Sequence, residues 1–435
     1  MAKELTKWEK LKKVRRRKKI LITFEALFAA IVIMIAIIWF VPPVKSAFLK
    51  GFTQTYIGKQ IMKWFGSEAF EKGVFDDEFD KSKLIKNNLK YKYSGEYLNF
   101  VLFGVDSRNK EVDTSNSDSI LIVSMHNTTG KVKMVSVYRD TMIGIYDKNG
   151  NFKEYFKVNS AFSNGGAEAA INTLNKNLDL DLTDYCTVNF GGVARIIDAL
   201  GGIKVNLTKA EKRQINYHMK STISSTGKKA KKVKKYGKNI KLNGIQAATY
   251  CRIRKATFID PENHKKISND FGRAARQRSV MMKLVDAAKK AGVSELEGMV
   301  DEVVNADSKK DRIISTSFDF DTIVNMIPVL FDFELNGSEG FPSRLQTGTY
   351  DGASYVVPQT LATNVKELHK YLYGEKNYKP TSTVNDASYT ITSKTGVSET
   401  SDGFDPTKIE GYAKGAKGSS DDYDYDDHWN SPYMR

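Results

Sequence analysis

Two aspartates stand at the ends of neighbouring strand-like segments, where they could bind a metal ion. Asp106 follows the hydrophobic segment 97–104, and Asp118 precedes the segment 119–125. If these segments pair in one sheet, the loop between them puts both carboxylates at the same end of it. Carboxylates without Cys or His suit a hard cation. Asp106 and Asp118 are therefore the candidate ligands of Mg²⁺, with Mn²⁺ as the alternative.

The next strand-like segment brings a cation and another carboxylate to the same place. The sequence NTTG at 127–130 predicts a turn, after which the segment 131–138 runs back and ends at Arg139 and Asp140. Ligands in open α/β sheets often bind at strand ends of this kind. We therefore expect Arg139 and Asp140 beside the predicted metal site.

Further arginines follow downstream. Arg252 and Arg254 are two residues apart in the segment 249–254, which we interpret as a strand, so both would face one side of it. A guanidinium group matches phosphate oxygens in a bidentate way. The pair predicts a binding surface for phosphate groups.

A predicted helix at 270–291 carries the rest of the polar set. Its residues Arg273, Arg276 and Gln277 have the spacing i, i+3, i+4 and share one face, and Asp270 is placed to cap it. A metal ion together with several arginines predicts a site for a pyrophosphate.

These side chains need a layered scaffold to position them. Strand-like segments at 97–104, 119–125, 131–138, 185–189 and 203–207 alternate with helix-like segments at 161–177, 192–200 and 270–291. This alternation predicts an α/β fold, a layered α-β-α domain with a central mixed sheet, over residues 93–375.

One transmembrane helix is expected to precede this domain. Residues 20–41 are almost entirely apolar and long enough to cross a bilayer, whereas residues 1–19 hold ten Lys or Arg against two Glu. The positive-inside rule places residues 1–19 in the cytoplasm. Residues 42–92 would then be an extracellular stalk, and the folded domain would lie outside the cell. The segment is too long for the apolar part of a cleaved signal peptide, and no cleavage site follows it.

The formal net charge of +16 suggests anionic partners, but its distribution argues against nucleic acid. Half of it lies in residues 1–19. Residues 219–241 hold nine lysines and no acid, which indicates a flexible loop, either simply solvated or a docking surface for anionic polymer or lipid headgroups.

Residues 376–435 are rich in Ser, Thr, Gly, Asp and Tyr and are predicted to be a disordered tail. Cys186 and Cys251 could form a disulfide or stay as buried thiols. Sequence alone favours neither.

Taken together, the sequence resembles the LytR-CpsA-Psr family of cell-wall glycopolymer ligases. The resemblance is carried, in order along the chain, by FGVDSR (103–108), SDSILIVS (117–124), VSVYRDT (135–141), KVNSAFSNGG (157–166), VNFGGVARIIDALGGIKVNL (188–207), LNGIQAATYCRIR (242–254) and DFGRAARQRSVM (270–281). Tyr138 departs from the family, in which proline is commoner before the Arg-Asp pair.

The resemblance implies a Mg²⁺-dependent phosphotransferase of the cell membrane. It would move a glycopolymer, such as teichoic acid or a capsular polysaccharide, from a polyprenyl-pyrophosphate carrier to peptidoglycan. Asp106 and Asp118 match the family's metal ligands. The implied pyrophosphate-binding set is Arg108, Arg139, Arg252, Arg254, Arg273 and Gln277, with Arg276 inside the same motif.

The implied chemistry also needs a tunnel and a base. The polyprenyl tail requires an apolar tunnel, whose lining the sequence does not name. Arg139 is expected to act on the reacting phosphate, and Asp140 and Asp270 are both candidates for the base that activates the acceptor hydroxyl. Water in place of the acceptor would give pyrophosphate hydrolysis.

Three other functions compete with this interpretation. A binding protein would retain lipid-linked pyrophosphate or glycan without turnover, and an extracellular pyrophosphatase would ignore peptidoglycan. A membrane-tethered transcriptional regulator would need a cytoplasmic DNA-binding domain, for which residues 1–19 are too short.

Overall fold

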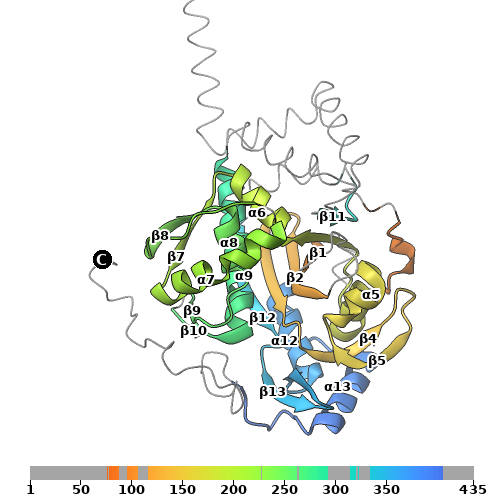
Figure 1. The fold of residues 1–435 in the computed structure, drawn as a ribbon. Helices are drawn as coiled ribbons and strands as arrows, with labels where there is room; N and C mark the ends of the chain where they lie inside the picture. Colours follow the sequence, from red (N-terminus) through yellow and green to blue (C-terminus); the bar gives the residue numbers. More distant parts are fainter. Residues whose placement is uncertain are drawn as a thin grey trace, which may run out of the picture. The chain divides into compact units, whose positions relative to one another are not determined.

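The structure, a computed structural model, describes residues 76, 78–87, 96–105, 116–226, 228–261, 264–291, 314–319, 322 and 334–404. All of them belong to one compact unit (Figure 1). The predicted segments 1–19 and 20–41, most of the predicted stalk, Asp106 and Arg108 lie outside the described residues. Within those ranges, no helix is long and apolar enough to cross a membrane.

A six-stranded mixed sheet forms the centre of the domain, with the strand order β11-β6-β1-β2-β3-β12. The pairs β1–β2 and β2–β3 are antiparallel, as expected, whereas β6 pairs with β1, and β12 with β3, in the parallel direction. The prediction of a central mixed sheet is confirmed. The strands are β1 (Tyr97–Val105), β2 (Ser117–His126), β3 (Lys131–Val137), β6 (Asp184–Asn189), β11 (Ile314–Thr316) and β12 (Glu334–Phe341).

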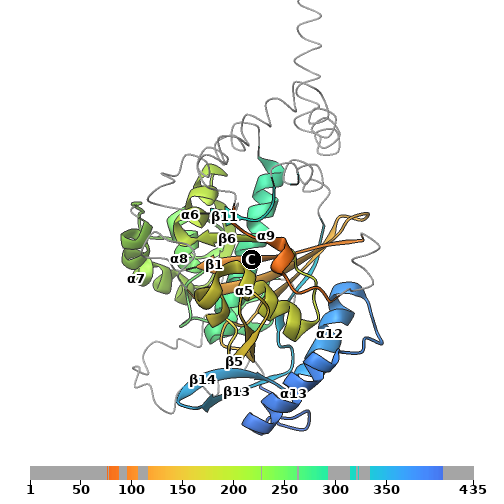
Figure 2. The same ribbon diagram turned by 90° about the vertical axis from the view of Figure 1, so that its right-hand side faces the viewer.

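One face of the sheet carries the main hydrophobic core. Side chains alternate along a strand, so Val101 and Phe103 of β1 and Ile122 of β2 all point into this core. Three helices complete the core: α5 (Ser160–Leu178), α12 (Leu361–Tyr373) and α13 (Ser382–Thr395). Figure 2 shows α12 and α13 side by side.

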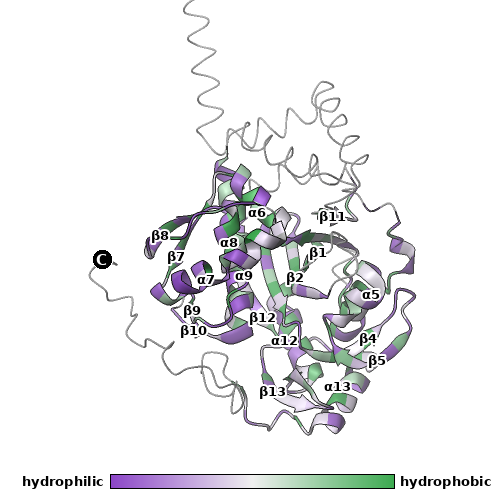
Figure 3. Cartoon of the chain, in the orientation of Figure 1, coloured by the Kyte–Doolittle hydropathy of each residue, from purple (hydrophilic) through white to green (hydrophobic). Residues whose placement is uncertain are grey.

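On the opposite face, α6 (Phe190–Ala199) and α9 (Asn269–Lys290) lie against the sheet. Next to them a second core joins α6 to the strands β7 (Ile203–Leu207) and β8 (Gly237–Leu242) and to the helices α7 (Lys209–Thr226) and α8 (Gly244–Tyr250). In Figure 3 the outer helix α7 is mainly hydrophilic. Helices α6 and α8 approach closely at Gly244, where a Cβ atom would overlap the carbonyl group of Ala194.

Two local predictions in this region are wrong. Residues 249–254 are not a strand, because α8 continues to Tyr250 and the chain then turns. The side chains of Asn243 and Gln246 form a capping box that starts α8. Residues 219–241 are not one loop, because α7 extends to Thr226 and β8 begins at Gly237.

The C-terminal part of the chain is also more ordered than expected. Helix α13 lies inside the predicted disordered tail, yet Val384 and Ile391 are buried in the main core. Asp179 accepts hydrogen bonds from the backbone N and Oγ1 of Thr381, at 2.8 and 2.7 Å. The disorder prediction is therefore wrong for residues 376–404.

Two hairpins and a short strand pair complete the domain. The hairpins are β4 (Met142–Tyr146) with β5 (Phe152–Lys157) and β13 (Leu345–Tyr350) with β14 (Ala353–Pro358), and the short strands are β9 (Phe258–Ile259) and β10 (Lys266–Ile267). A 3-10 helix, η1, spans Lys81–Lys83. Cys186 and Cys251 are both free thiols, and burial raises the pKa of each to about 12.

Candidate functional site

Arg139 and Asp140 are held where β3 ends. The backbone N–H of Asn159 donates to the carbonyl of Arg139 (3.2 Å), and that of Val356 donates to the carbonyl of Asp140 (2.9 Å). The backbone of Arg139 and Asp140 is therefore held in place by hydrogen bonds from two other parts of the chain.

The guanidinium of Arg139 lies among three carboxylates. Its Nη1 is 2.6 Å from Oδ1 of Asp118, and its Nε is 3.4 Å from Oδ2 of Asp140 and 3.5 Å from Oδ2 of Asp270. Each of these side chains is only about a fifth exposed. Burial lowers the pKa of Arg139, but the three aspartates outweigh it and the net shift is upward. The sheet and α9 thus bring together the predicted residues Asp118, Arg139, Asp140 and Asp270.

Two further arginines meet at Asp270. Nε of Arg254 is 3.2 Å from Oδ1 of Asp270, and Nη2 of Arg273 is 2.9 Å from its Oδ2. Nη2 of Arg273 also donates to the backbone carbonyl of Asp118 (3.1 Å). Burial, followed by repulsion from Arg139 and Arg254, holds the pKa of Arg273 below its usual value despite Asp270 and Asp118. We call these six residues, with Lys157, whose Nζ is 3.1 Å from Oδ1 of Asp140, the arginine–aspartate cluster.

A polar cavity of about 310 Å³ opens beside this cluster. Four cationic side chains line it: Arg252, Arg254, Lys255 and Arg273. Among the described residues that line it, Asp118 is the only carboxylate. The guanidinium carbon of Arg252 lies 4.9 Å from the ring centre of Phe190, which keeps its charge against the cavity wall. This excess of positive charge fits a phosphorylated ligand.

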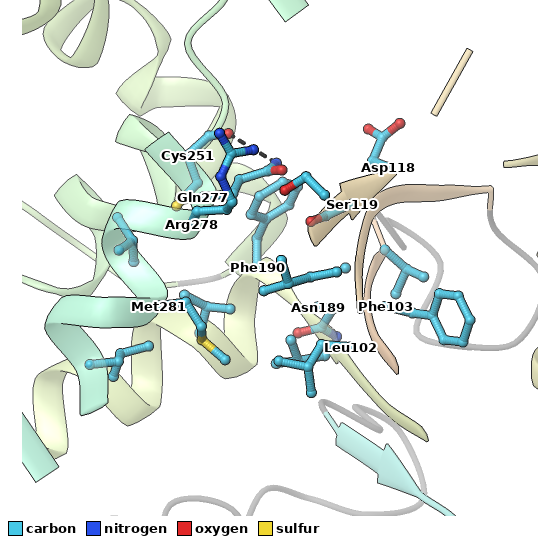
Figure 4. Close-up of a pocket in the computed structure, with 18 residues that line it drawn as sticks. Leu102, Phe103, Asp118, Ser119, Asn189, Phe190, Cys251, Gln277, Arg278 and Met281 are labelled. Atoms are coloured by element: carbon cyan, nitrogen blue, oxygen red, sulfur yellow. Dashed lines mark hydrogen bonds between the residues drawn. The ribbon is translucent and has the colours of Figure 1, made fainter. Parts of the chain in front are cut away.

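An apolar pocket of about 90 Å³ lies between the sheet and helices α6 and α9 (Figure 4). Leu102 and Leu121 come from the sheet, and Val193 and Met281 from the helices. Asp118 and Phe190 line both this pocket and the polar cavity. In the view of Figure 4, Asp118, Ser119 and Gln277 gather at one end and Leu102 and Met281 at the other. The two spaces therefore form one amphipathic site.

The match to known proteins decides the family. The model of the LytR_cpsA_psr family matches residues 67–365, more than half of the chain. The chain belongs to this family.

Curated relatives agree with this membership, and one solved structure shares the fold. A polyisoprenyl-teichoic acid–peptidoglycan teichoic acid transferase of Bacillus cereus, TagU, is 32% identical over 206 residues, 47% of this chain and 57% of that protein. Biofilm regulatory protein A of Streptococcus mutans is 28% identical over 265 residues, 59% of each chain. A crystal structure of a Streptococcus agalactiae protein has a TM-score of 0.51 at 24% identity, over 68% of this chain and 95% of that one, and shows the same fold. The chain thus spans little more than half the length of these two curated relatives.

Arg276 does not join the arginine–aspartate cluster, although it stands within the family's helix motif. It is fully buried, its Nε is 2.9 Å from Oε1 of Glu211, and its other nitrogens donate to the carbonyls of Ile253 and Ala256. All its polar atoms are thus used inside the protein. The sequence analysis placed Arg276 with the pyrophosphate-binding residues. That prediction is wrong, and Arg276 is a structural residue.

Gln277, by contrast, lies at the edge of the apolar pocket. It donates to the carbonyl of Cys251 (3.3 Å), which Figure 4 shows as a dashed line. Four members of the predicted set line the amphipathic site: Arg252, Arg254, Arg273 and Gln277. Arg139 does not line it, but its Nη1 contacts Asp118, which lines both spaces.

His218 lines the polar cavity and carries no sequence motif that marked it. It lies on α7, 34 residues before Arg252, and only the folding of α7 over the cavity reveals it. Burial, together with Arg252 and Lys255, lowers the pKa of His218 below its usual value. A neutral imidazole at neutral pH can accept or donate a hydrogen bond in this cavity.

The donor set fits a hard cation in part. Within the described ranges, no group of three or more His, Cys, Asp or Glu side chains is arranged to hold a metal. Oδ2 of Asp118 is 3.9 Å from Nη1 of Arg273, while Oδ1 of Asp118 is engaged by Arg139 at 2.6 Å. One carboxylate oxygen thus suits Mg²⁺, and the second predicted ligand, Asp106, lies outside the described residues.

Proposed function

We propose that this protein transfers a glycopolymer from a polyprenyl-pyrophosphate carrier to peptidoglycan. The observation that carries the proposal is the amphipathic site, in which a cationic cavity and an apolar pocket share Asp118 and Phe190. A prenyl pyrophosphate has matching parts, a dianionic head and a hydrocarbon tail. The teichoic acid transferase of Bacillus cereus, to which the chain is similar, supports the same reaction class.

The arginines would bind and orient the pyrophosphate. Arg252, Arg254 and Arg273 face the cavity, so their N–H groups can reach phosphate oxygens. Asp270 fixes the positions of Arg254 and Arg273. Preorganised donors of this kind stabilise charge that develops in the transition state. Arg139, in the middle of the cluster, would act on the phosphate that reacts.

The bond changes balance without an oxidant or a reductant. The oxygen of an acceptor hydroxyl forms a bond to the glycan-side phosphorus, the bond from that phosphorus to the bridging oxygen breaks, and polyprenyl phosphate leaves. Asp140 would accept the hydroxyl proton, because Asp270 already orients three arginines. Asp118, with Asp106, would hold Mg²⁺, which supplies further neutralisation of the phosphoryl oxygens.

The proposal includes a place in the cell. Residues 20–41 would anchor the protein in the cell membrane with residues 1–19 in the cytoplasm, so that the folded domain meets lipid-linked glycans and peptidoglycan outside the cell.

A transfer assay tests this function. The full chain in detergent is mixed with a lipid-pyrophosphate-linked glycan, peptidoglycan oligomers and Mg²⁺, and glycan covalently bound to peptidoglycan is measured. We expect Arg139→Ala to reduce transfer at least 100-fold, because the charge on the reacting phosphate loses its partner. Arg139→Lys, which keeps one charge, should retain more activity. Tyr217→Ala, at an exposed position of α7, is the matched control and should leave transfer unchanged.

Two results would contradict the proposal. Donor binding without any product, across several glycans, would indicate a binding protein. Release of polyprenyl phosphate that is indifferent to peptidoglycan would indicate a pyrophosphatase.

A further inference from the structure

A second groove, of about 380 Å³, lies on the side of the domain formed by β5, the β13–β14 hairpin and α13. Figures 1 and 2 both place these elements next to one another. In the part of the chain that the structure describes, no residue that lines this groove also lines the polar cavity or the apolar pocket. It is therefore a separate site, which the function proposed above does not use.

The groove has an aromatic wall. Phe152 is 48% exposed, and its ring centre is 5.2 Å from that of Tyr155. Further in, the rings of Phe156 and Tyr355 meet edge to face at 5.9 Å. Phe152 and Tyr155 thus present neighbouring aromatic rings at the surface of the groove. Flat aromatic faces are complementary to the C–H faces of pyranose rings, because the ring's negative face attracts the weakly positive C–H groups.

Polar groups surround the aromatic wall. Glu154, Asp351, Thr390 and Lys394 line the same groove, and Nζ of Lys394 lies 5.7 Å from the ring centre of Tyr155. Carboxylates and a hydroxyl can exchange hydrogen bonds with sugar hydroxyl and amide groups. Among the described lining residues there are two carboxylates and one ammonium, and the ammonium of Lys157 next to Tyr355 is paired with Asp140. The groove therefore disfavours a polyanion such as a teichoic acid chain and favours a saccharide of low charge.

Direct contacts link the groove to the arginine–aspartate cluster. Nζ of Lys157, at the end of β5, lies 5.5 Å from the ring centre of Tyr355 and forms the 3.1 Å ion pair with Asp140. The neighbouring residue of β14, Val356, donates to the carbonyl of Asp140. A ligand that contacts Tyr355 would thus lie on the side of the cluster where Asp140 stands.

The position also fits the direction of the reaction. In phosphoryl transfer the attacking and leaving oxygens are roughly in line on opposite sides of phosphorus. In the proposed function, the leaving polyprenyl phosphate would occupy the apolar pocket between the sheet and α9. The acceptor must then approach from another side, and Asp140, Lys157 and Tyr355 mark that side.

We propose that the groove of β5, β14 and α13 binds the glycan strand of the peptidoglycan acceptor, several sugars away from the reacting hydroxyl. This inference rests on the proposed function for the identity of the ligand, but the binding of an amino-sugar oligosaccharide to the groove does not depend on transfer. Phe152 and Tyr155 provide the stacking surface, and Glu154 and Asp351 provide hydrogen-bond acceptors.

The test measures saccharide binding and kinetics in the full chain. Binding of a peptide-free peptidoglycan tetrasaccharide is titrated for Phe152→Ala, Glu154→Gln and the control Tyr217→Ala, another exposed aromatic, located on α7. We expect Phe152→Ala to weaken tetrasaccharide binding about tenfold and Glu154→Gln to weaken it less. Transfer assays should show a KM for the acceptor raised by a similar factor at nearly constant kcat, with binding of geranyl pyrophosphate unchanged.

The outcomes separate the two proposals. Tetrasaccharide binding that is equal in Phe152→Ala, Glu154→Gln and the unmodified protein overturns the groove assignment. The assignment is also overturned if poly(glycerol phosphate) competes with the tetrasaccharide in the unmodified protein and this competition is lost in Phe152→Ala, because the groove would then bind a polyanion. Loss of tetrasaccharide binding in Phe152→Ala, in a protein that never transfers glycan, supports the groove and refutes the proposed function.

Discussion

Two arginines on helix α9 have different roles, one in the candidate site and the other in the protein interior. Arg273 and Arg276 are three residues apart on α9, and both side chains are almost fully buried. Arg273 meets Asp118 and Asp270 at the edge of the polar cavity, whereas Arg276 meets Glu211 in the interior. Helical spacing predicted that both arginines would act at one site. The spacing did not show that the two side chains have different partners, because Glu211, the partner of Arg276, is 65 residues away in the sequence.

Exchange of each arginine for glutamine should give opposite results. Arg276→Gln leaves Glu211 buried without a counter-charge, so we expect a loss of about 3–5 kcal/mol in the free energy of unfolding. Arg273→Gln leaves Asp270 with Arg139 and Arg254, so its main effect should be weaker binding of geranyl pyrophosphate. Urea unfolding and calorimetric titration measure the two effects. A larger stability loss in Arg273→Gln than in Arg276→Gln would refute this division.

At the scale of elements, local signals predicted well and distant pairings did not. The strands β1, β2 and β3 follow one another in antiparallel pairs, and the turn residues between β2 and β3 mark their reversal. The pairing of β12 with β3 joins residues about 200 positions apart, and no local pattern predicts it. The segment 249–254 resembled a strand because apolar and polar residues alternate in it. The capping box of Asn243 and Gln246 was the signal that could have identified helix α8.

The contact between α6 and α8 gives a prediction for this scale. Gly244 has no space for a methyl group, because a Cβ atom would overlap the carbonyl and Cα atoms of Ala194. We expect Gly244→Ala to push the helices apart and to lower the free energy of unfolding by about 1–3 kcal/mol. Gly374→Ala is an informative comparison, since a Cβ at Gly374 meets no neighbour and only its positive φ of 75° opposes the change. Thermal unfolding showing that Gly244→Ala is as stable as the unmodified protein would contradict the close packing.

At the scale of the whole molecule, the C-terminal segment completes the core. Composition suggested disorder after residue 375, because Ser, Thr, Asp and Gly dominate. Only three-dimensional packing reveals that Val384 and Ile391 cover α5 and that His369 of α12 is fully buried, 2.9 Å from the carbonyl of Leu178. Its ring stacks on Tyr378 with 3.6 Å between ring centres. Residues near the end of the described chain thus stabilise the helix that supports the sheet.

This burial predicts a pH dependence of stability. Burial lowers the pKa of His369 from 6.5 to about 4, so the unfolded chain takes up a proton at a higher pH than the folded one. Stability from this group is complete above pH 6.5 and is lost as the pH falls from about 6.5 to about 4, by roughly 3 kcal/mol. His369→Gln keeps a donor for Leu178 but cannot titrate, and it should lose correspondingly less stability over that range. Equal slopes of unfolding free energy against pH in the two proteins would refute the assignment to His369.

The central claim is that one amphipathic site holds a prenyl pyrophosphate, and a crystal structure of the full chain with geranyl pyrophosphate tests it most directly. We predict a pyrophosphate group within hydrogen-bonding distance of Arg139, Arg254 and Arg273, with the prenyl chain between Leu102 of β1 and Met281 of α9. A pyrophosphate bound elsewhere, or a prenyl chain outside the pocket between the sheet and α9, would contradict the account.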